Sequence, residues 1–434
     1  MREDTIFALG TGAGRAAIAI IRLSGEAVSS ILVNFAGGVP EPRETRLASL
    51  RDPLNDEILD RGIIFFVPGP NSPTGEDYAE LQCHGGRAIV SALLAALSRQ
   101  QHVRMAEPGE FVRRGFANGK LDLSQAEGLA DLIDAETQSQ RRQALRLSGG
   151  VLRRKVEAWR SALIASLALI EAQLDFSDEA DVERFSYAEL KETLSPIVSD
   201  MAAALAVAPA SERMREGFSV MILGPPNSGK STLINKLIDR EIAIVSSQPG
   251  TTRDMIEAHL EVEGLPITFI DTAGLREASD EIEQMGIDRV YRRLPAADLI
   301  LWLSPQEAPP PLEVENAQDI LFVRSKIDLN APSEIALGIC SLTGAGLDDL
   351  LAKIAEKARA QLGAGDVALF ARQRHRVATQ AAYAAIRHAL KSEKPLEFIA
   401  DDLRLAARSL GKIIGDVDVE DILDVVFSRF CIGK

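Results

Sequence analysis

Eight consecutive residues, GPPNSGKS from Gly224 to Ser231, have the types and spacing of a phosphate-binding loop. They match the pattern G-x-x-x-x-G-K-[ST], with a strand-like run before them and a helix-like run after them. In such a loop, backbone N–H groups and the helix N-terminus hold the phosphates. Lys230 would reach the β and γ oxygens, and Ser231 would bind Mg²⁺. The predicted loop contacts are Asn227, Ser228, Gly229, Lys230, Ser231 and Thr232.

Three later segments follow in the order that a GTPase requires. PGTTRD contains Thr252, which could close on Mg²⁺ and the γ-phosphate. DTAG places Asp271 at a strand end for the metal and Gly274 beside the γ-phosphate. SKID contributes Asp328, whose carboxylate can accept both N–H donors on the edge of guanine, an edge that adenine lacks. We therefore expect GTP to be the nucleotide.

The guanine side departs from the usual pattern at two places. Ser325 stands where the motif Asn-Lys-x-Asp has its Asn, and it is followed by Lys326. The segment ICSLTGAG resembles a Ser-Ala-Lys loop, with Cys340 and Ser341 at its first two positions. We predict that the missing Asn weakens guanine binding while Asp328 keeps the discrimination between bases.

The catalytic residues are less regular than the binding residues. Many small GTPases orient the attacking water with a Gln after Asp-x-x-Gly, but this chain has Leu275 there. The acidic run nearby offers Asp280, Glu281 and Glu283, which could otherwise be a solvated helix start. Since no segment marks an arginine finger, a cation could supply positive charge, and the Asn227 side chain could hold it.

Composition limits the classes of function. The chain has 434 residues, 46% of them hydrophobic and 26% charged, with a net charge of −15. This charge argues against nucleic-acid binding through a broad basic face, so any RNA contact should be local or shared with a more basic partner. Three scattered cysteines are too few for a disulfide framework or a zinc site. Without a signal peptide or a membrane-spanning run, we expect a cytoplasmic protein with no membrane association.

Hydrophobic patterning divides the chain into regions. Residues 1–120 mix short strand-like runs with Gly- and Pro-rich turns, which predicts a small α+β domain. A capping box of Ser124 and Glu127 predicts a helix start, another helix is expected over 187–207, and SERMREG reads as a linker. Strands then alternate with helices, as in a parallel sheet. The predicted domains are 1–120, 121–212 (helical), 213–364 (α/β) and 365–434 (helical).

A long helix is also predicted after Gly149–Gly150. Its apolar residues recur at spacings of three, four and seven, which is typical of a bundle core. They are Leu152, Val156, Trp159, Leu163, Ile170 and Leu174.

The chain ends in SRFCIGK, with Cys431 four positions from the terminus, as in a prenylation signal. The acidic segment before it argues against a lipid anchor, and so do Gly433 and Lys434 at the last two positions. A packed helix end and a functional cysteine both remain open.

Together these segments resemble the MnmE (TrmE) family of GTPases over the whole chain. The resemblance rests on DTIFALGTGAGRAAIAIIRLSG, AEPGEFVRRGFANGKLDLSQAEGLADLI, GPPNSGKSTLIN, PGTTRD, DTAGLREASDEIEQMGI and FCIGK. It implies three parts: an N-terminal α+β folate-binding and dimerisation domain, a discontinuous all-α domain, and an inserted α/β P-loop GTPase (Ras-like) domain.

The resemblance also implies roles for individual residues. Folate contacts carry over to Arg22, Glu80, Lys120 and Lys434. Cys431 becomes a site residue and Glu283 the group that orients water. Potassium would replace an arginine finger, with contacts at Asn227, Ser246, Gln248 and Thr251.

The implied function is modification of the wobble uridine of certain tRNAs. A homodimer would hydrolyse GTP, and 5-formyltetrahydrofolate or 5,10-methylenetetrahydrofolate would supply a one-carbon unit. A MnmG-type flavoprotein, in a heterotetramer or larger complex, would supply FAD. Two alternatives remain: a regulatory GTPase of ribosome assembly, and a folate-dependent aminomethyltransferase that acts on protein. The first needs a basic RNA-binding surface, which a net charge of −15 disfavours.

Overall fold

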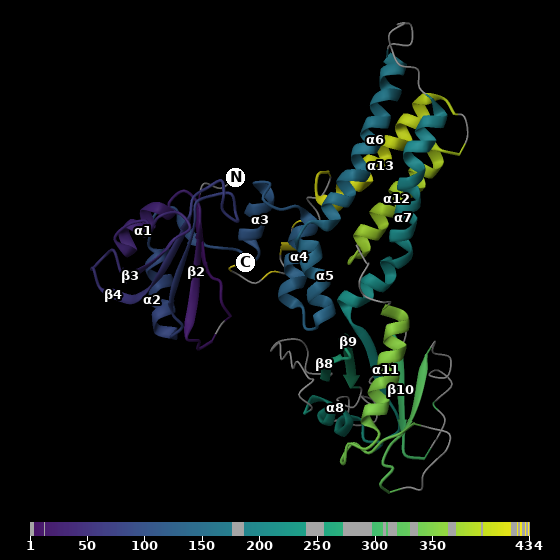
Figure 1. Ribbon diagram of the computed structural model, residues 1–434. Helices are drawn as coiled ribbons and strands as arrows, with labels where there is room; N and C mark the ends of the chain where they lie inside the picture. The colour runs from purple at the N-terminus through teal and green to yellow at the C-terminus, as the bar shows by residue number, and fades with distance from the viewer. Residues whose placement is uncertain are drawn as a thin grey trace, which may run out of the picture. The chain divides into compact units, whose positions relative to one another are not determined.

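The chain forms two compact units in a computed structural model (Figure 1). The structure describes residues 4–12, 14–175, 186–239, 256–271, 297–306, 310, 319–329, 337–362, 370–391, 394–417, 423, 426–427, 430 and 433. Unit 1 comprises residues 1–130, 148–157 and 410–434, and unit 2 comprises residues 131–147 and 158–409.

Unit 1 contains a six-stranded sheet with the order β3-β4-β5-β2-β1-β6. Its strands are β1 (Thr5–Leu9), β2 (Ile18–Ser24), β3 (Thr45–Arg51), β4 (Ile58–Val67), β5 (Tyr78–His84) and β6 (Val103–Met105). Only β1 and β6 pair in parallel among these strands. Helices α1 (Val28–Ala36) and α2 (Arg87–Ser98) cover one face with an apolar core. This mixed arrangement confirms the predicted α+β class.

The two faces of this sheet differ because side chains alternate along each strand. On β5, Ala79, Leu81 and Cys83 belong to the core beneath α1 and α2. Tyr78 and Glu80 therefore lie on the opposite face, which we call the second face. There Tyr78 packs with Phe111 of α3 (Glu110–Ala117) in a smaller cluster.

The start of α4 (Leu123–Asp134) corrects a prediction. The cap is Asp122, whose side chain accepts a hydrogen bond from the Gln125 N–H at 3.0 Å. The Gln125 side chain in turn accepts from the Asp122 N–H, at 3.1 Å. The predicted box of Ser124 and Glu127 was wrong by two residues, because an Asp caps as well as a Ser and stands earlier in the chain.

Five long helices follow: α5 (Gln138–Ser148), α6 (Val151–Asp175), α7 (Tyr187–Glu216), α12 (Gln373–Ala389) and α13 (Leu396–Ile414). The predicted stripe on α6 is buried at Leu152, Val156, Trp159, Leu163 and Ile170, whereas Leu174 near the helix end is half-buried. Helix α7 packs against α12 within unit 2. In the sequence, the α/β part is therefore preceded by the helices α5 to α7 and followed by α12 and α13, as predicted.

Helix α7 contradicts the predicted linker. It continues through SERMRE to Glu216, although it contains Pro196 and Pro209. Ser211 and Met214 are buried there, and Gln143 of α5 donates to the Ser211 hydroxyl at 2.7 Å. Tertiary packing outweighs the polar composition that suggested a linker.

By length and mean hydropathy, α7 is also the one helix in the described ranges that could span a membrane.

The α/β part of unit 2 is a second six-stranded sheet, with the order β12-β11-β10-β7-β9-β8. Its elements are β7 (Phe218–Leu223), α8 (Lys230–Ile238), β8 (Ile256–Val262), β9 (Leu265–Asp271), β10 (Leu299–Ser304), β11 (Ile320–Arg324), β12 (Leu337–Gly338) and α11 (Leu347–Leu362). All neighbouring pairs are parallel except β8 and β9. The predicted α/β class of this part is confirmed, and the carboxyl ends of its parallel strands share one edge.

Candidate functional sites

The phosphate loop begins where β7 ends beside β10. A side chain at Gly224 would place its Cβ 2.0 Å from the Leu303 carbonyl oxygen, so only glycine fits there. Asn227 and Gly229 have φ angles of 59° and 100°, a left-handed conformation that Gly and Asn adopt most readily. Helix α8 starts directly after Gly229. The predicted loop therefore lies at the N-terminus of a helix, the position that favours phosphate.

Lys230 points back over this loop. Its ammonium group donates to the carbonyl oxygens of Gly224 at 2.9 Å and Pro225 at 3.1 Å. Ser231 and Thr232 follow it in the first turn of α8. The structure thus brings the six predicted phosphate-loop residues together at one end of β7.

The guanine-side residues follow β11 and β12 at the same edge. The Ser325 N–H donates to the Ser304 carbonyl at 3.1 Å, which fixes the strand exit beside β10. Lys326 has a φ of 57°, and the exposed Asp328 follows in the turn. The ICSLTGAG segment turns back on Cys340, whose N–H donates to the Ala345 carbonyl at 2.9 Å. Ser341 lies in this turn.

The shorter Ser325 side chain has a structural consequence. Ser325 is 1% exposed, and its hydroxyl has no hydrogen-bond partner among the residues that the structure describes. A buried hydroxyl without a partner is unfavourable. The first side chain of the motif therefore contributes no hydrogen bond within the described region.

A second set of polar residues lies on the second face of the unit 1 sheet. Arg22 on β2 stands directly opposite Glu80 on β5. Its Nε lies 3.4 Å from Glu80 Oε1, and the two side chains are 31% and 18% exposed. Tyr78 donates its hydroxyl to the same Oε1 at 2.7 Å. These three side chains form a partly buried charged cluster.

The C-terminal tail contacts this cluster. Arg22 donates from Nη1 to the Gly433 carbonyl oxygen at 3.1 Å, although 411 positions separate the two residues. Gly433 has a φ of 98°, and a Cβ there would lie 2.2 Å from the Leu9 carbonyl oxygen. Gly433 therefore accepts no larger side chain where the tail crosses β1.

Aromatic packing holds the tail in place further upstream. Phe427 and Phe430 pack with Val112, Leu123 and Ala126. The Phe427 backbone also lies against Gly109, where a Cβ would be 2.4 Å from the Phe427 carbonyl oxygen. Phe427 and Phe430 therefore bury the C-terminal segment against α3 and α4 within unit 1.

Comparisons with known proteins agree with these features. The profile described as "MnmE helical domain" matches residues 123–431, and "GTP-binding protein TrmE N-terminus" matches residues 5–120. A tRNA modification GTPase MnmE from Beijerinckia indica is 49% identical over 99% of this chain and 96% of its own length. One from Methylobacterium radiotolerans is 48% identical over 99% of both chains.

The chain belongs to the MnmE family of tRNA modification GTPases. Among solved structures, the G domain of the FeoB iron transporter of T. maritima is 27% identical, covering 32% of this chain and 98% of that one with a TM-score of 0.26. Era from Aquifex aeolicus is 24% identical, covering 41% and 68% with a TM-score of 0.26.

Several residues predicted from the GTPase motifs or from the MnmE resemblance lie outside the described residues. They are Ser246, Gln248, Thr251, Thr252, Gly274, Glu283, Cys431 and Lys434. Asp271 ends β9, which places its backbone beside β7 at the same sheet edge. Lys120 is exposed in the turn after α3, and no described contact joins it to Arg22 or Glu80. The described residues contain no cluster of three His, Cys, Asp or Glu side chains that could hold a metal.

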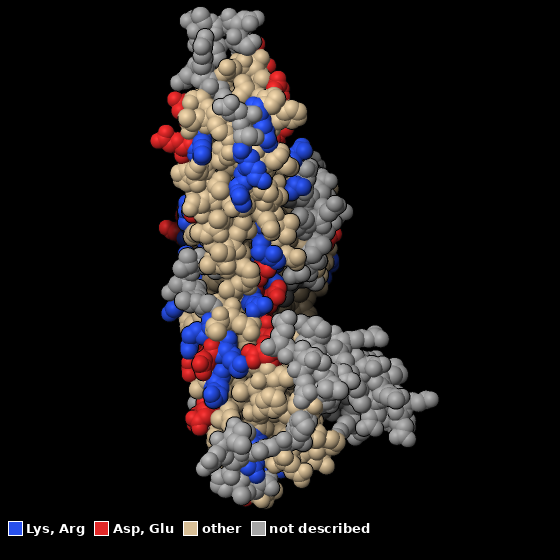
Figure 2. Space-filling model, turned by 90° about the vertical axis from the view of Figure 1, so that its right-hand side faces the viewer, with Lys and Arg blue, Asp and Glu red and all other residues tan. Residues whose placement is uncertain are grey.

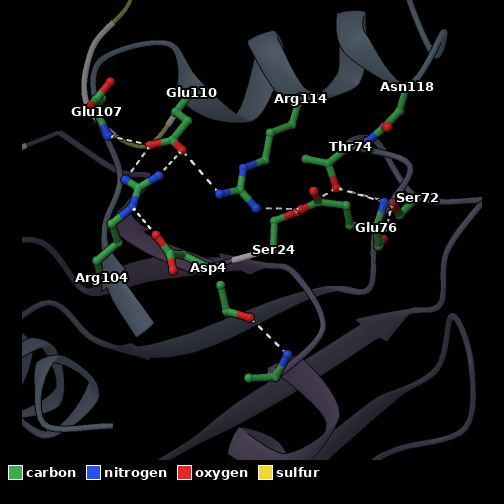
Figure 3. A network of polar contacts seen from close by, with 12 residues as sticks. Asp4, Ser24, Ser72, Thr74, Glu76, Arg104, Glu107, Glu110, Arg114 and Asn118 are labelled. Carbon is green, nitrogen blue, oxygen red and sulfur yellow. Dashed lines mark hydrogen bonds and ion pairs between the residues drawn. The ribbon is translucent and has the colours of Figure 1, made fainter. Parts of the chain in front are cut away.

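A polar network that the sequence did not suggest supports the MnmE-type N-terminal region (Figure 3). Arg104 of β6 donates to Glu110 at 2.9 Å, and Arg114 connects Glu110 to Glu76. Burial raises the pKa of Glu110, but hydrogen bonds from Arg104, the Glu107 N–H and Arg114 outweigh it and hold the pKa at about 2. The network fixes the segment that leads into β5. Glu110 and Arg114 are four residues apart on α3, whereas Glu76 reaches the network from a distant part of the sequence.

Proposed function

We propose that this chain hydrolyses GTP and, with a MnmG-type FAD protein, installs a (carboxymethyl)aminomethyl group at carbon 5 of the wobble uridine of tRNA. A tetrahydrofolate derivative would supply the one-carbon unit. The observation that carries this proposal is the hydrogen bond from Arg22 to Gly433. It joins the Cys-Ile-Gly-Lys tail to the pair Arg22 and Glu80 on the sheet.

The chemistry of this cluster suits a folate. Arg22 can pair a carboxylate such as the glutamate tail, and Glu80 can accept hydrogen bonds from ring N–H groups. Arg22 Nε is buried and lies 3.4 Å from Glu80 Oε1, so the two side chains hold each other in place on the sheet. Lys120 and Lys434 would add positive charge. The folate, as 5-formyltetrahydrofolate or 5,10-methylenetetrahydrofolate, would carry the one-carbon unit, and Cys431 would act beside it.

In the GTPase part, Lys230 stabilises charge on the β and γ oxygens, and the loop N–H groups orient the phosphates. Mg²⁺ would be held by Ser231 and Thr252, with Asp271 nearby. Potassium would supply positive charge between two GTPase domains, and Glu283 would orient the attacking water. The proposed potassium contacts are Asn227, Ser246, Gln248 and Thr251. Faster GTP turnover in potassium than in sodium is expected, and equal turnover in the two salts would contradict this role.

A homodimer is part of the proposal. On the second face of the unit 1 sheet, Leu47 on β3 stands opposite Ile63 on β4, and the two are 59% and 40% exposed. Ile18 on β2 is 59% exposed. Exposed apolar residues on neighbouring strands of a sheet are consistent with a surface that a protein partner covers. We expect Ile63→Glu to convert dimers to monomers in light scattering, whereas the exposed Leu342→Glu in unit 2 should leave the mass unchanged.

We propose a cytoplasmic protein that shares its tRNA with the partner. On the face shown in Figure 2, Lys and Arg lie in small separate groups among acidic and uncharged side chains. Together with the net charge of −15, this favours local phosphate contacts over one broad basic surface.

The decisive test compares tRNA and ribosomes in a strain that lacks the gene. We expect loss of the modified wobble uridine, measured by mass spectrometry of tRNA nucleosides, with a normal ribosome profile. Intact modification together with defective ribosomes would instead support a ribosome-assembly GTPase.

A further inference from the structure

Tyr78 lies in the proposed folate cluster but was not identified from the sequence. It is the first residue of β5, two positions before Glu80, so both side chains lie on the second face of the sheet. Tyr78 is 6% exposed. A buried tyrosine needs an acceptor for its hydroxyl, and here that acceptor is Glu80 Oε1, at 2.7 Å.

Packing on several sides fixes the ring of Tyr78. Phe111 meets it edge to face, with ring centroids 6.5 Å apart and an interplanar angle of 85°. Ile6, Ala8 and Ala106 complete the cluster. Burial also raises the pKa of Tyr78, so the hydroxyl keeps its proton and remains a donor at physiological pH.

The backbone before Tyr78 is held as well. Glu76 accepts hydrogen bonds from Ser24 at 2.8 Å and from Arg114 at 2.8 Å (Figure 3). The Asp77 side chain accepts from the Gly69 N–H at 3.0 Å. The hydroxyl of Tyr78 therefore occupies a fixed point against which a flexible carboxylate can be oriented.

The contacts of Glu80 are uneven. Oε1 accepts from Tyr78 and faces Arg22 Nε, whereas no hydrogen bond from the described residues reaches Oε2. Glu80 has two free χ rotations before its carboxylate, and ordering such a side chain costs conformational entropy. A fixed hydroxyl that donates a hydrogen bond to Oε1 orders the Glu80 side chain before a ligand binds, so less entropy is lost on binding.

We propose that Tyr78 is a positioning residue that holds Glu80 so that Oε2 faces a ligand bearing a ring N–H donor, as in a pterin. This inference rests on the proposed folate function. Because Arg22 contacts both Glu80 and Gly433, the same hydroxyl also stabilises the arrangement that docks the tail.

The test is Tyr78→Phe in the full chain, which removes only the hydroxyl, with Tyr383→Phe on α12 as the matched control. Binding of 5-formyltetrahydrofolate is measured by calorimetry. We expect about tenfold weaker binding for Tyr78→Phe, the range for losing a hydrogen bond to a charged group, and no change for the control. GTP turnover should stay at the native value, and circular dichroism should show a folded protein. Unchanged folate affinity in a folded Tyr78→Phe protein would overturn the proposal.

A double-mutant cycle separates positioning from other roles. If Tyr78 acts through Glu80, Tyr78→Phe should weaken folate binding no further in a Glu80→Ala background, which removes the acceptor of the hydroxyl. An equal loss in both backgrounds would mean direct ligand contact and would contradict positioning. Should Tyr78→Phe fold poorly, Phe111→Leu loosens the ring and keeps the hydroxyl, and it should weaken binding by a smaller factor that also disappears with Glu80→Ala. Native protein that binds no 5-formyltetrahydrofolate would refute the folate function itself.

Discussion

The two candidate sites present different chemical groups to a ligand. The phosphate loop offers backbone N–H groups from one contiguous stretch, and its shape depends on Gly224, Asn227 and Gly229. The cluster around Arg22 offers side chains from two strands and the backbone of a tail 411 positions away. The first site depends on local conformation, and the second depends on the fold of the whole of unit 1.

This difference has a consequence for mutation. In a backbone site most side chains can change, and the sensitive positions are those with positive φ and the one lysine that reaches the phosphates. In a side-chain site each residue orients another, so a substitution at one residue should change the contribution of the others to ligand binding. Variants can therefore separate the two sites.

The largest effect is expected from Lys230→Ala. Removing one group that stabilises developing charge lowers kcat on the order of 10²–10³-fold. Phosphate release with saturating GTP measures this loss, and 5-formyltetrahydrofolate binding should not change. Retention of native GTP turnover would remove Lys230 from the catalytic residues.

The second-largest effect is expected at the cluster around Arg22. Arg22→Ala should weaken 5-formyltetrahydrofolate binding by about 10–100-fold, because a charged hydrogen bond contributes about 1.5–3 kcal/mol. GTP turnover serves as the internal control. An affinity within twofold of the native value would show that Arg22 is a surface charge.

A third prediction concerns the network that supports the side-chain site. The pKa of Glu110 is held at about 2, below its ordinary value of 4.5. Its contribution to stability is therefore present above about pH 4.5 and is lost as the pH falls toward 2. Glu110→Gln should lower the free energy of unfolding by about 2 kcal/mol at pH 7 in urea titrations. The difference should narrow in acid, and a constant difference would contradict the ion-pair role.

The smallest expected effect concerns the residues predicted to bind guanine. Ser325→Asn should tighten GTP binding by about fivefold, the equivalent of one hydrogen bond of about 1 kcal/mol. Mant-GTP titration measures it, with Ser341→Ala as a comparison in the neighbouring turn. An unchanged affinity would contradict the prediction that the missing Asn side chain weakens guanine binding.

Local patterns in the sequence predicted much of the fold. The α/β strands and the α6 stripe were predicted because their apolar periods are set by neighbouring residues. The α7 extension through Ser211 and Met214 was missed because burial, which depends on distant α5, outweighed a polar composition. The Asp122 cap was missed because two overlapping capping patterns compete within six residues.

The two candidate sites also differ in how much of each could be predicted from local sequence. The phosphate loop was predicted from one stretch, and its residues lie together at the end of β7. Arg22 and Glu80 were named only by resemblance, and Tyr78 and Gly433 were not predicted as contacts. Spacing in sequence carries no signal for residues that meet through sheet register and tail docking.

Modified wobble uridine in a deletion strain that expresses Glu80→Gln or Lys230→Ala shows whether the two sites serve one reaction. We predict that both variants fail to restore the modification, while Glu80→Gln retains native GTP turnover and Lys230→Ala retains 5-formyltetrahydrofolate binding. Full modification by Glu80→Gln would contradict the claim that the two sites serve one reaction.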